Sequence, residues 1–207
     1  MTHRFPAHVY ALLLLAALLA PSGADAAGGP LVEALKARQA RIDSILSAHP
    51  GKLGPAARDT LEEALSGGFD FSVMARGALA DWENRSPAER AEYTAAFEKL
   101  IRRSLMRRVD IYRIEGVDYR TEAVEADHGK VDTVVRAKHA TTEVLWEFVR
   151  TGTGWRVSDY AIDGVSTVRN YRRQFARLLE TRGFAGLIER IHKRAEEIGA
   201  EVEREEV

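Results

Sequence analysis

Cysteine is absent from this chain of 207 residues. Its absence excludes disulfide bonds, a thiol nucleophile and any lipid attached through a cysteine side chain. Small exported domains depend on disulfides because they cannot build a sufficient core. This chain has the length of an ordinary domain and 45% apolar residues, so we expect packing alone to stabilise it.

An excess of charge of one sign is also missing. Charged residues make up 29% of the chain, yet the formal net charge is −1. Recruitment of nucleic acid requires a basic field over one face of a protein. The composition therefore predicts no nucleic-acid partner and no permanent attachment to an anionic membrane.

Signatures of metal and catalytic sites are scarce as well. Beyond the N-terminal segment the histidines are His49, His128, His139 and His192, and none falls in a recognised metal-ligand motif. The chain contains no Gly-x-Ser-x-Gly sequence and no Gly-rich phosphate loop. We expect no bound metal, and a protein that carries a ligand rather than converts it.

Two carboxylates on a predicted strand, Asp159 and Asp163, are the candidates for a general base. The alternative is structural: Asp159 accepts hydrogen bonds at the sheet edge, and Asp163 serves the turn at Gly164. An acid–base pair needs a second positioned group. The sequence shows none, so we favour the structural role.

Residues 1–26 have the three parts of a secretory signal peptide. A basic start with Arg4 precedes an apolar run at 9–20, and Ala24-Asp25-Ala26 supplies a small-x-small cleavage pattern. An uncleaved membrane anchor is the alternative, but the apolar run is shorter than the ~20 residues that span a bilayer. We expect cleavage after Ala26, export from the cytoplasm, and a single domain formed by residues 27–207.

Apolar residues at helical spacing predict several helices. These cover residues 31–47, 56–65, 86–112, 168–182 and 184–198. Ser86, Pro87 and Glu89 form a capping-box start for the third helix. Gly183 is expected to end the fourth.

In the segment between the third and fourth helices, apolar residues recur at every second position. Strands are predicted at 117–126, 130–140, 142–150 and 155–163, and their tight connections require antiparallel neighbours. Four strands cannot close into a barrel, so helices must cover one face. We therefore expect an α+β fold: a curved four-stranded antiparallel sheet covered by N- and C-terminal helices, with a binding space between them. The covered face should present Tyr119, Val131, Val135, Trp146, Phe148 and Val157.

Arginines gather on the outer faces of the long helices. They include Arg102, Arg103, Arg107, Arg172 and Arg173. Arginines in such positions bind a lipid phosphate at a cavity mouth, dock acidic partners, or form an ordinary solvated face. We take these five as candidates for partner docking, and the sequence leaves the other two roles open.

Several blocks of the chain, in the same order, resemble a known family. They are FDF at 69–71, SPAER at 86–90, GWRV at 154–157, GVS at 164–166 and NYRRQF at 170–175, followed by Gly183 and LI at 187–188. The pattern is similar to the MlaC or toluene-tolerance auxiliary family and covers nearly all of the chain after the leader. Two positions depart from it: Ser104-Leu105 replaces an expected Thr-Tyr, and Ala80 replaces a common glycine.

The resemblance implies a nuclear-transport-factor-like cone with a deep apolar pocket, and no enzymatic activity. Members of the family are periplasmic shuttles for diacyl phospholipid in the Mla pathway. They pass lipid between an outer-membrane lipoprotein–porin complex and an inner-membrane ABC transporter, which maintains outer-membrane lipid asymmetry. A related branch carries hopanoid-type lipids. We expect this chain to be a monomeric lipid carrier of the phospholipid-binding branch.

A lipid pocket would be lined by the apolar faces of the sheet and helices. We expect its floor to consist of Val135, Trp146, Phe148, Val157 and Ile162. Leu105, Val109 and Tyr171 should close it from the helices.

Overall fold

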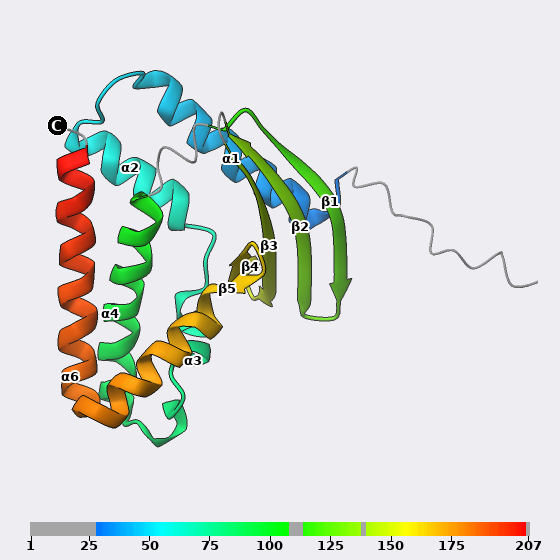
Figure 1. The fold of residues 1–207 in the computed structure, drawn as a ribbon. Coiled ribbons are helices and arrows are strands. Elements are labelled where there is room, and N and C mark those ends of the chain that lie inside the picture. The colour runs from blue at the N-terminus through cyan, green and yellow to red at the C-terminus, as the bar shows by residue number, and fades with distance from the viewer. Residues whose placement is uncertain (1–27, 108–113, 138–139, 206–207) are drawn as a thin grey trace, which may run out of the picture.

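The computed structural model describes residues 28–107, 114–137 and 140–205 (Figure 1). The predicted signal peptide at 1–26 and the predicted pocket residue Val109 lie outside these ranges. The helices are α1 (Pro30–Ala48), α2 (Pro55–Ser66), α3 (Phe71–Ala78), α4 (Pro87–Met106) and α6 (Thr167–Glu205), with the short 3-10 helix η1 (Trp82–Asn84) before α4. The strands are β1 (Gly116–Glu125), β2 (His128–Ala137), β3 (Ala140–Thr151), β4 (Gly154–Ile162) and β5 (Val165–Ser166).

The strands form one open antiparallel sheet in the order β1-β2-β3-β4-β5. The α+β class and the antiparallel meander are confirmed, but the prediction of four strands is wrong by one short strand. β5 pairs with the end of β4 through a two-residue turn at Asp163 and Gly164, whose φ angles are 47° and 79°. Two positive φ angles suit a tight hairpin turn. The cone-like shape that the family resemblance implies stays an expectation.

Two helix boundaries follow the sequence signals closely. At α4 the Ser86 side chain accepts a hydrogen bond from the backbone of Glu89, and the Glu89 side chain accepts one from the backbone of Ser86, as the capping box predicts. Gly183 interrupts α6 with φ 66°, a conformation that glycine adopts without steric cost. α6 therefore has two arms, which Figure 1 shows at an angle to each other.

The helices take two different positions relative to the sheet. In Figure 1, α1 lies behind β1 to β3, whereas α4 and the second arm of α6 run side by side away from the sheet. Buried side chains from α1 through α6 form one contiguous core cluster. Within the described ranges, no helix is both long and apolar enough to cross a membrane.

The start of α1 is fixed to the sheet by a single carboxylate. Glu122 of β1 accepts hydrogen bonds from the backbone N–H groups of Leu31 (3.3 Å) and Val32 (3.0 Å). These N–H groups have no partner within the helix, and a negative charge at a helix N-terminus is favourable. This contact holds α1 over the face of the sheet that forms the site described next.

Candidate lipid-binding site

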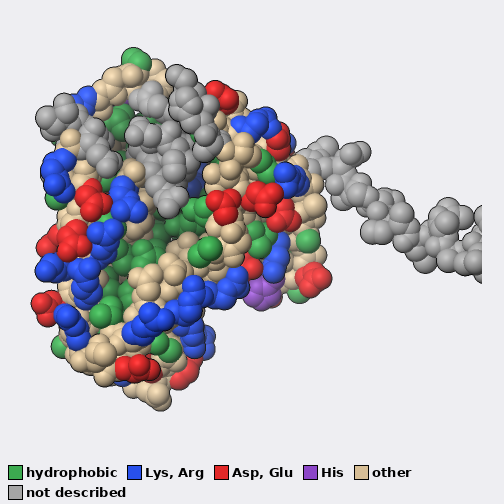
Figure 2. Space-filling model, viewed as in Figure 1, with side chains coloured by type: hydrophobic (Ala, Val, Ile, Leu, Met, Phe, Trp, Pro, Cys, Tyr) green, Lys and Arg blue, Asp and Glu red, His purple; other side chains and the backbone are tan. Residues whose placement is uncertain are grey.

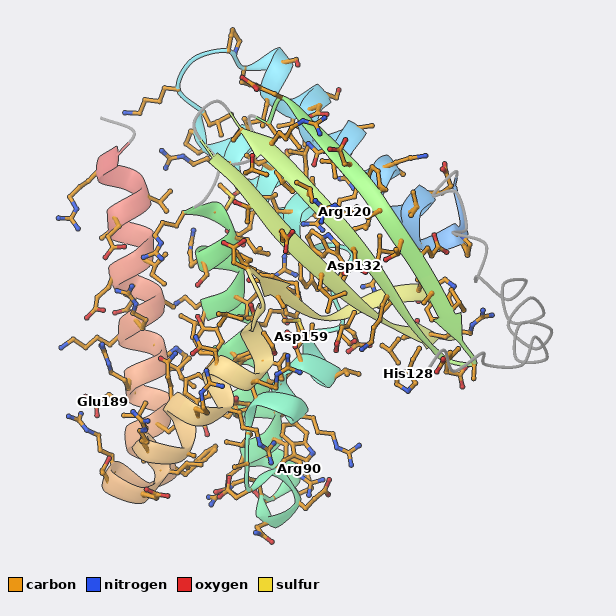
Figure 3. All side chains as sticks on the ribbon, turned by 45° about the vertical axis from the view of Figure 1, so that its right-hand side comes forward. Arg90, Arg120, His128, Asp132, Asp159 and Glu189 are labelled. Atoms are coloured by element: carbon orange, nitrogen blue, oxygen red, sulfur yellow. The ribbon has the colours of Figure 1, made fainter. Side chains whose placement is uncertain are left out.

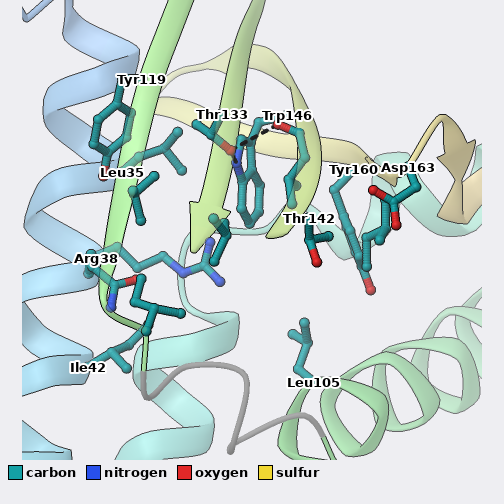
Figure 4. A pocket seen from close by; sticks show the side chains of 16 residues that line it. Leu35, Arg38, Ile42, Leu105, Tyr119, Thr133, Thr142, Trp146, Tyr160 and Asp163 are labelled. Carbon is teal, nitrogen blue, oxygen red and sulfur yellow. Dashed lines mark hydrogen bonds between the residues drawn. The ribbon is translucent and has the colours of Figure 1, made fainter. Parts of the chain in front are cut away.

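A cavity of about 190 Å³, here called the first cavity, lies between α1 and the sheet. Figure 4 shows its lining side chains converging from α1, the strands and the end of α4. Most of the lining is apolar. The lining residues are Leu35, Arg38, Gln39, Ile42, Leu105, Ile114, Val117, Tyr119, Thr133, Val135, Thr142, Val144, Trp146, Tyr160, Ile162 and Asp163.

Strand register explains why these side chains meet. Val117 lies opposite Val135, which lies opposite Thr142 on β3. Trp146 lies opposite Tyr160 on β4. Directly paired residues share one face of a sheet, so alternate residues of four strands line one apolar surface.

Among the described lining residues, Arg38 is the one Lys or Arg. Its guanidinium carbon lies 5.1 Å from the ring centre of Phe69 and 5.1 Å from that of Trp146. Figure 4 shows the side chain reaching from α1 toward the sheet. Aromatic rings attract a cation at this distance, so two ring faces help to hold the charge of Arg38 at the cavity.

The polar groups at the back of the cavity satisfy each other. Trp146 Nε1 donates a hydrogen bond to Thr133 Oγ1 at 3.1 Å, and that hydroxyl donates to the carbonyl oxygen of Val144 at 2.9 Å. The dashed line in Figure 4 marks the first of these bonds. Buried polar groups that are paired in this way cost little. The sheet wall therefore presents mainly ring faces and aliphatic groups to a ligand.

A larger space of about 500 Å³, here called the second hollow, lies between α4, β4 and the two arms of α6. Figure 2 views the helical side of the molecule, where apolar side chains form the floor of a hollow bordered by Lys and Arg. Tyr160 and Ile162 line both spaces and so form the partition between them. The other lining residues are Leu100, Ser104, Arg107, Val165, Ser166, Thr167, Asn170, Tyr171, Gln174, Phe175, Leu178, Arg190, Ile191 and Arg194.

The predicted pocket residues fall in three places. Leu105, Val135, Trp146 and Ile162 line the first cavity. Tyr171 lines the second hollow, where its ring packs on Phe175. Phe148 and Val157, which are 3% and 2% exposed, lie in the packed core. The backbone of Val157 also pairs with Gly68 and Asp70, so this residue joins the sheet to the start of α3.

Sequence reasoning missed the contribution of α1 and part of the sheet. Leu35, Arg38 and Ile42 occupy one helical stripe of α1, and a cation within that stripe was the available signal. Thr133 follows the period of two on β2, whereas a register shift on β4 places Tyr160 on the same face as Val157, which alternation alone does not predict. Ser104 and Leu105, where the chain departs from the family pattern, face the second hollow and the first cavity respectively.

Asp159 has a capping role in this structure. Its Oδ1 accepts hydrogen bonds from the backbone N–H groups of Tyr160 (2.8 Å) and Val168 (3.0 Å), and its Oδ2 accepts one from the Ser166 hydroxyl. Figure 3 shows Asp159 where the sheet passes into α6. Asp163 Oδ1 accepts a bond from the backbone N–H of Glu143 at 3.1 Å. Both carboxylates therefore accept hydrogen bonds from the backbone, as predicted for Asp159. Asp163 bonds across to β3 rather than within the turn at Gly164, where it was predicted to act.

Four of the five candidate docking arginines make contacts between helices. Arg102 bonds to Glu98 and, across to α2, to Ser66, and Arg103 lies 3.5 Å from Glu62 of α2. Arg107 lies 3.2 Å from Glu201 of α6, and Arg172 donates to the carbonyl oxygen of Gly77 at 2.9 Å. Within the described part of the chain, Arg173 hydrogen-bonds to Asn170 of its own helix. Docking by these residues stays a prediction.

Potential metal ligands do not gather in the part of the chain that the structure describes, where no group of three or more His, Asp or Glu side chains could hold an ion. Figure 3 shows His128 and Asp132 on the sheet and Glu189 on the second arm of α6, well separated.

Comparison with known proteins agrees with this geometry. The family model for the MlaC protein matches residues 37–193. A solved structure of a phospholipid-binding protein from Ralstonia solanacearum, in complex with a phospholipid, is similar with a TM-score of 0.66 and 18% sequence identity. The match covers 81% of this chain and 97% of that one, and it shows a shared fold. No curated protein matches. The chain belongs to the MlaC family.

Proposed function

We propose that this protein is a phospholipid carrier that holds acyl chains in the first cavity and moves lipid without changing it chemically. The observation that carries the proposal is the apolar cavity between α1 and the sheet. Family membership and the phospholipid bound to the protein from Ralstonia solanacearum support it. In the full proposal, the carrier works in the periplasm after its leader is removed. It shuttles diacyl phospholipid between an outer-membrane lipoprotein–porin complex and an inner-membrane ABC transporter of the Mla pathway.

The energetics of lipid transfer require an enclosed apolar site. Two acyl chains hold on the order of 30 methylenes, and removal of each from water is worth ~0.8 kcal/mol, or roughly 25 kcal/mol in all. A carrier must nearly match this value, because otherwise lipid would not leave a membrane. Leu105, Val135, Trp146 and Ile162 supply apolar contact of the kind required.

The proposal is tested on the purified protein. Denaturing extraction followed by mass spectrometry should find close to one diacyl lipid for each chain. Protein that is lipid-free as purified, and that takes up no lipid from liposomes, would contradict the proposal. The same spectra identify the lipid class, so a hopanoid in place of phospholipid would assign the protein to the other branch of the family.

A cone-fold enzyme with Asp159 or Asp163 as general base is the rival. The hydrogen bonds of Asp159 to two backbone N–H groups and to Ser166 favour a structural role instead. A general base must be free to accept a proton from a substrate. Chemical change of the bound lipid during incubation, detected in the same spectra, would support the hypothesis that the protein is an enzyme.

Delivery to two membrane complexes requires transient contacts, which charged surfaces provide. Arg173 is a predicted docking arginine that is exposed and, among the described residues, hydrogen-bonds to Asn170 of its own helix. We expect Arg173→Glu to slow lipid transfer to transporter-containing liposomes and to leave lipid content intact, whereas Arg182→Glu serves as the matched control on the same arm. Equal rates of lipid transfer for both variants and the parent would show that Arg173 belongs to an ordinary solvated helix face and does not dock a partner.

A further inference from the structure

The first cavity is too small for a whole diacyl lipid. Its volume of about 190 Å³ is on the scale of the ~150 Å³ cavity that takes one benzene molecule. Sites for larger organic ligands measure ~300–1,000 Å³. The second hollow, at about 500 Å³, meets the first cavity at Tyr160 and Ile162. If the protein carries lipid as proposed above, the ligand must extend into this second space.

The two spaces differ in the charges that line them. Among the described residues that line the first cavity, Arg38 and Asp163 are charged, one of each sign. The second hollow is lined by Arg107, Arg190 and Arg194, and its described lining holds no carboxylate. Ser104, Asn170 and Gln174 add neutral hydrogen-bonding groups on the facing walls. One wall of the second hollow is therefore cationic, and its floor is apolar.

The three arginines are held in place by two glutamates outside the lining. Arg190 and Arg194 each lie 3.2 Å from Glu197, and Arg194 lies 3.5 Å from Glu201. Arg107 of α4 lies 3.2 Å from the same Glu201. Among the residues that the structure describes, three cations share two carboxylates, which leaves this group of side chains with an excess of one positive charge. Fixed arginines of this kind bind phosphate oxygens by charge-assisted hydrogen bonds.

We propose that the second hollow is the headgroup site of the carrier, in which Arg190 and Arg194, with Arg107, hold the phosphate of the bound lipid. The acyl chains then pass Tyr160 and Ile162 toward the first cavity. The proposal rests on the proposed function and adds to it a preference for lipids that carry a phosphate. A diacylglycerol with the same acyl chains lacks that group and is the natural comparison.

The test measures how strongly the protein prefers phosphate-bearing lipid. Protein is incubated with vesicles that contain equal amounts of phosphatidylglycerol and diacylglycerol with identical chains. It is then separated from the vesicles, and the ratio of the two retained lipids is read by mass spectrometry. Arg194→Gln should lower this ratio by about tenfold or more, which is the loss expected for a charge-assisted hydrogen bond.

Two further variants separate phosphate binding from simple structural support. Lys193→Gln removes an exposed positive charge one residue away and should leave the ratio unchanged. Glu197→Gln removes a carboxylate partner from both Arg190 and Arg194 and should raise the ratio, because their hydrogen bonds become available to phosphate. A purely structural cluster predicts that Arg194→Gln and Glu197→Gln change the retention of both lipids alike.

Other outcomes overturn the assignment in distinguishable ways. A parent protein that retains both lipids equally, or an unchanged ratio in all three variants, refutes the headgroup site and leaves the carrier function standing. A parent that retains neither lipid refutes the carrier function itself. Titration calorimetry of lipid-free protein with inorganic phosphate covers the remaining case. Strong binding of free phosphate would make the hollow a phosphate site and refute its assignment to a lipid headgroup.

Discussion

The first cavity and the second hollow lie next to each other but are lined by different secondary-structure elements and different types of side chain. The first lies between a helix and a sheet, where strands present apolar side chains at every second position. The second lies among helices, whose faces mix apolar residues with arginines. The partition, Tyr160 and Ile162, belongs to both. The comparison shows that two residues of β4 border both an apolar space under α1 and a space whose arginines come from α4 and α6.

The largest expected effect on lipid retention comes from the introduction of a charge into the first cavity. Val135→Glu places a carboxylate in its apolar lining, where an unpaired charge is costly. Lipid retention should be abolished while circular dichroism shows an intact fold. Thr141→Glu is the matched control, because Thr141 is exposed on the opposite face of the neighbouring strand. A molten Val135→Glu protein would place Val135 in the core and would contradict its assignment as a lining residue.

The next largest effect on lipid retention is expected from a substitution in the partition between the two spaces. Ile162→Trp adds bulk where the two spaces meet, and overpacking typically costs ~1–3 kcal/mol. Retention of diacyl lipid should fall by about tenfold, because the chains no longer pass from one space to the other. Mass spectrometry measures the retained lipid, and Val124→Trp on the exposed part of β1 is the control. Undiminished retention would show that lipid occupies only one of the spaces.

A smaller effect is expected at the cap of α6, the helix that forms two walls of the second hollow. Asp159→Ala removes the acceptor for Val168 N–H and Ser166, and loss of a helix cap costs ~0.5–2 kcal/mol. The melting temperature should drop by several degrees. Asp163→Asn keeps an acceptor for the backbone N–H of Glu143 and should change stability little. An unchanged melting temperature for Asp159→Ala would argue against its capping role.

The smallest effect is a pH dependence in the second hollow. Hydrogen bonds from Arg194 and Arg190 lower the pKa of Glu197 below its ordinary value of 4.5. A carboxylate with a lowered pKa stabilises the folded state above that ordinary value, and the contribution is lost as the pH falls through the lowered pKa. Arg190, Arg194 and the nearby Glu201 are the charged groups involved.

Thermal melts of the parent and of Glu197→Gln measure this contribution. The parent should melt slightly higher at neutral pH, and the difference should disappear as the pH falls below 4.5. A difference that persists to lower pH would assign the effect to packing rather than to the ion pairs.

Local signals in the sequence predicted much of the fold. The capping box at Ser86 and Glu89 marks the start of α4, and Gly183 marks the bend in α6. Both depend on backbone geometry within a few residues, so the sequence carries them directly. The two-residue strand β5 was missed because an alternation of period two cannot be recognised in two residues. Only its pairing with β4 makes it a strand.

The candidate site was predicted in part for a similar reason. Val135 and Trp146 follow strand alternation, which predicted them on the covered face, and both line the first cavity. Ile162 was predicted only as part of the pocket floor, and it reaches the same face because of a register shift on β4. Alternation does not distinguish a residue that lines a cavity from one packed against another element. Phe148 and Val157 lie on the same face yet belong to the core, because the start of α3 pairs with Val157 there.

The sequence by itself determined the α+β class, the order of the long elements and the apolar faces, because periodicity and capping act over short stretches of chain. Tertiary structure decided where those faces meet. Glu122 holds the start of α1 from about 90 residues away, and Arg107 meets Glu201 across a separation of 94 residues. Such contacts depend on how elements dock, which no local pattern records, and they create both the covered cavity and the charged wall of the second hollow.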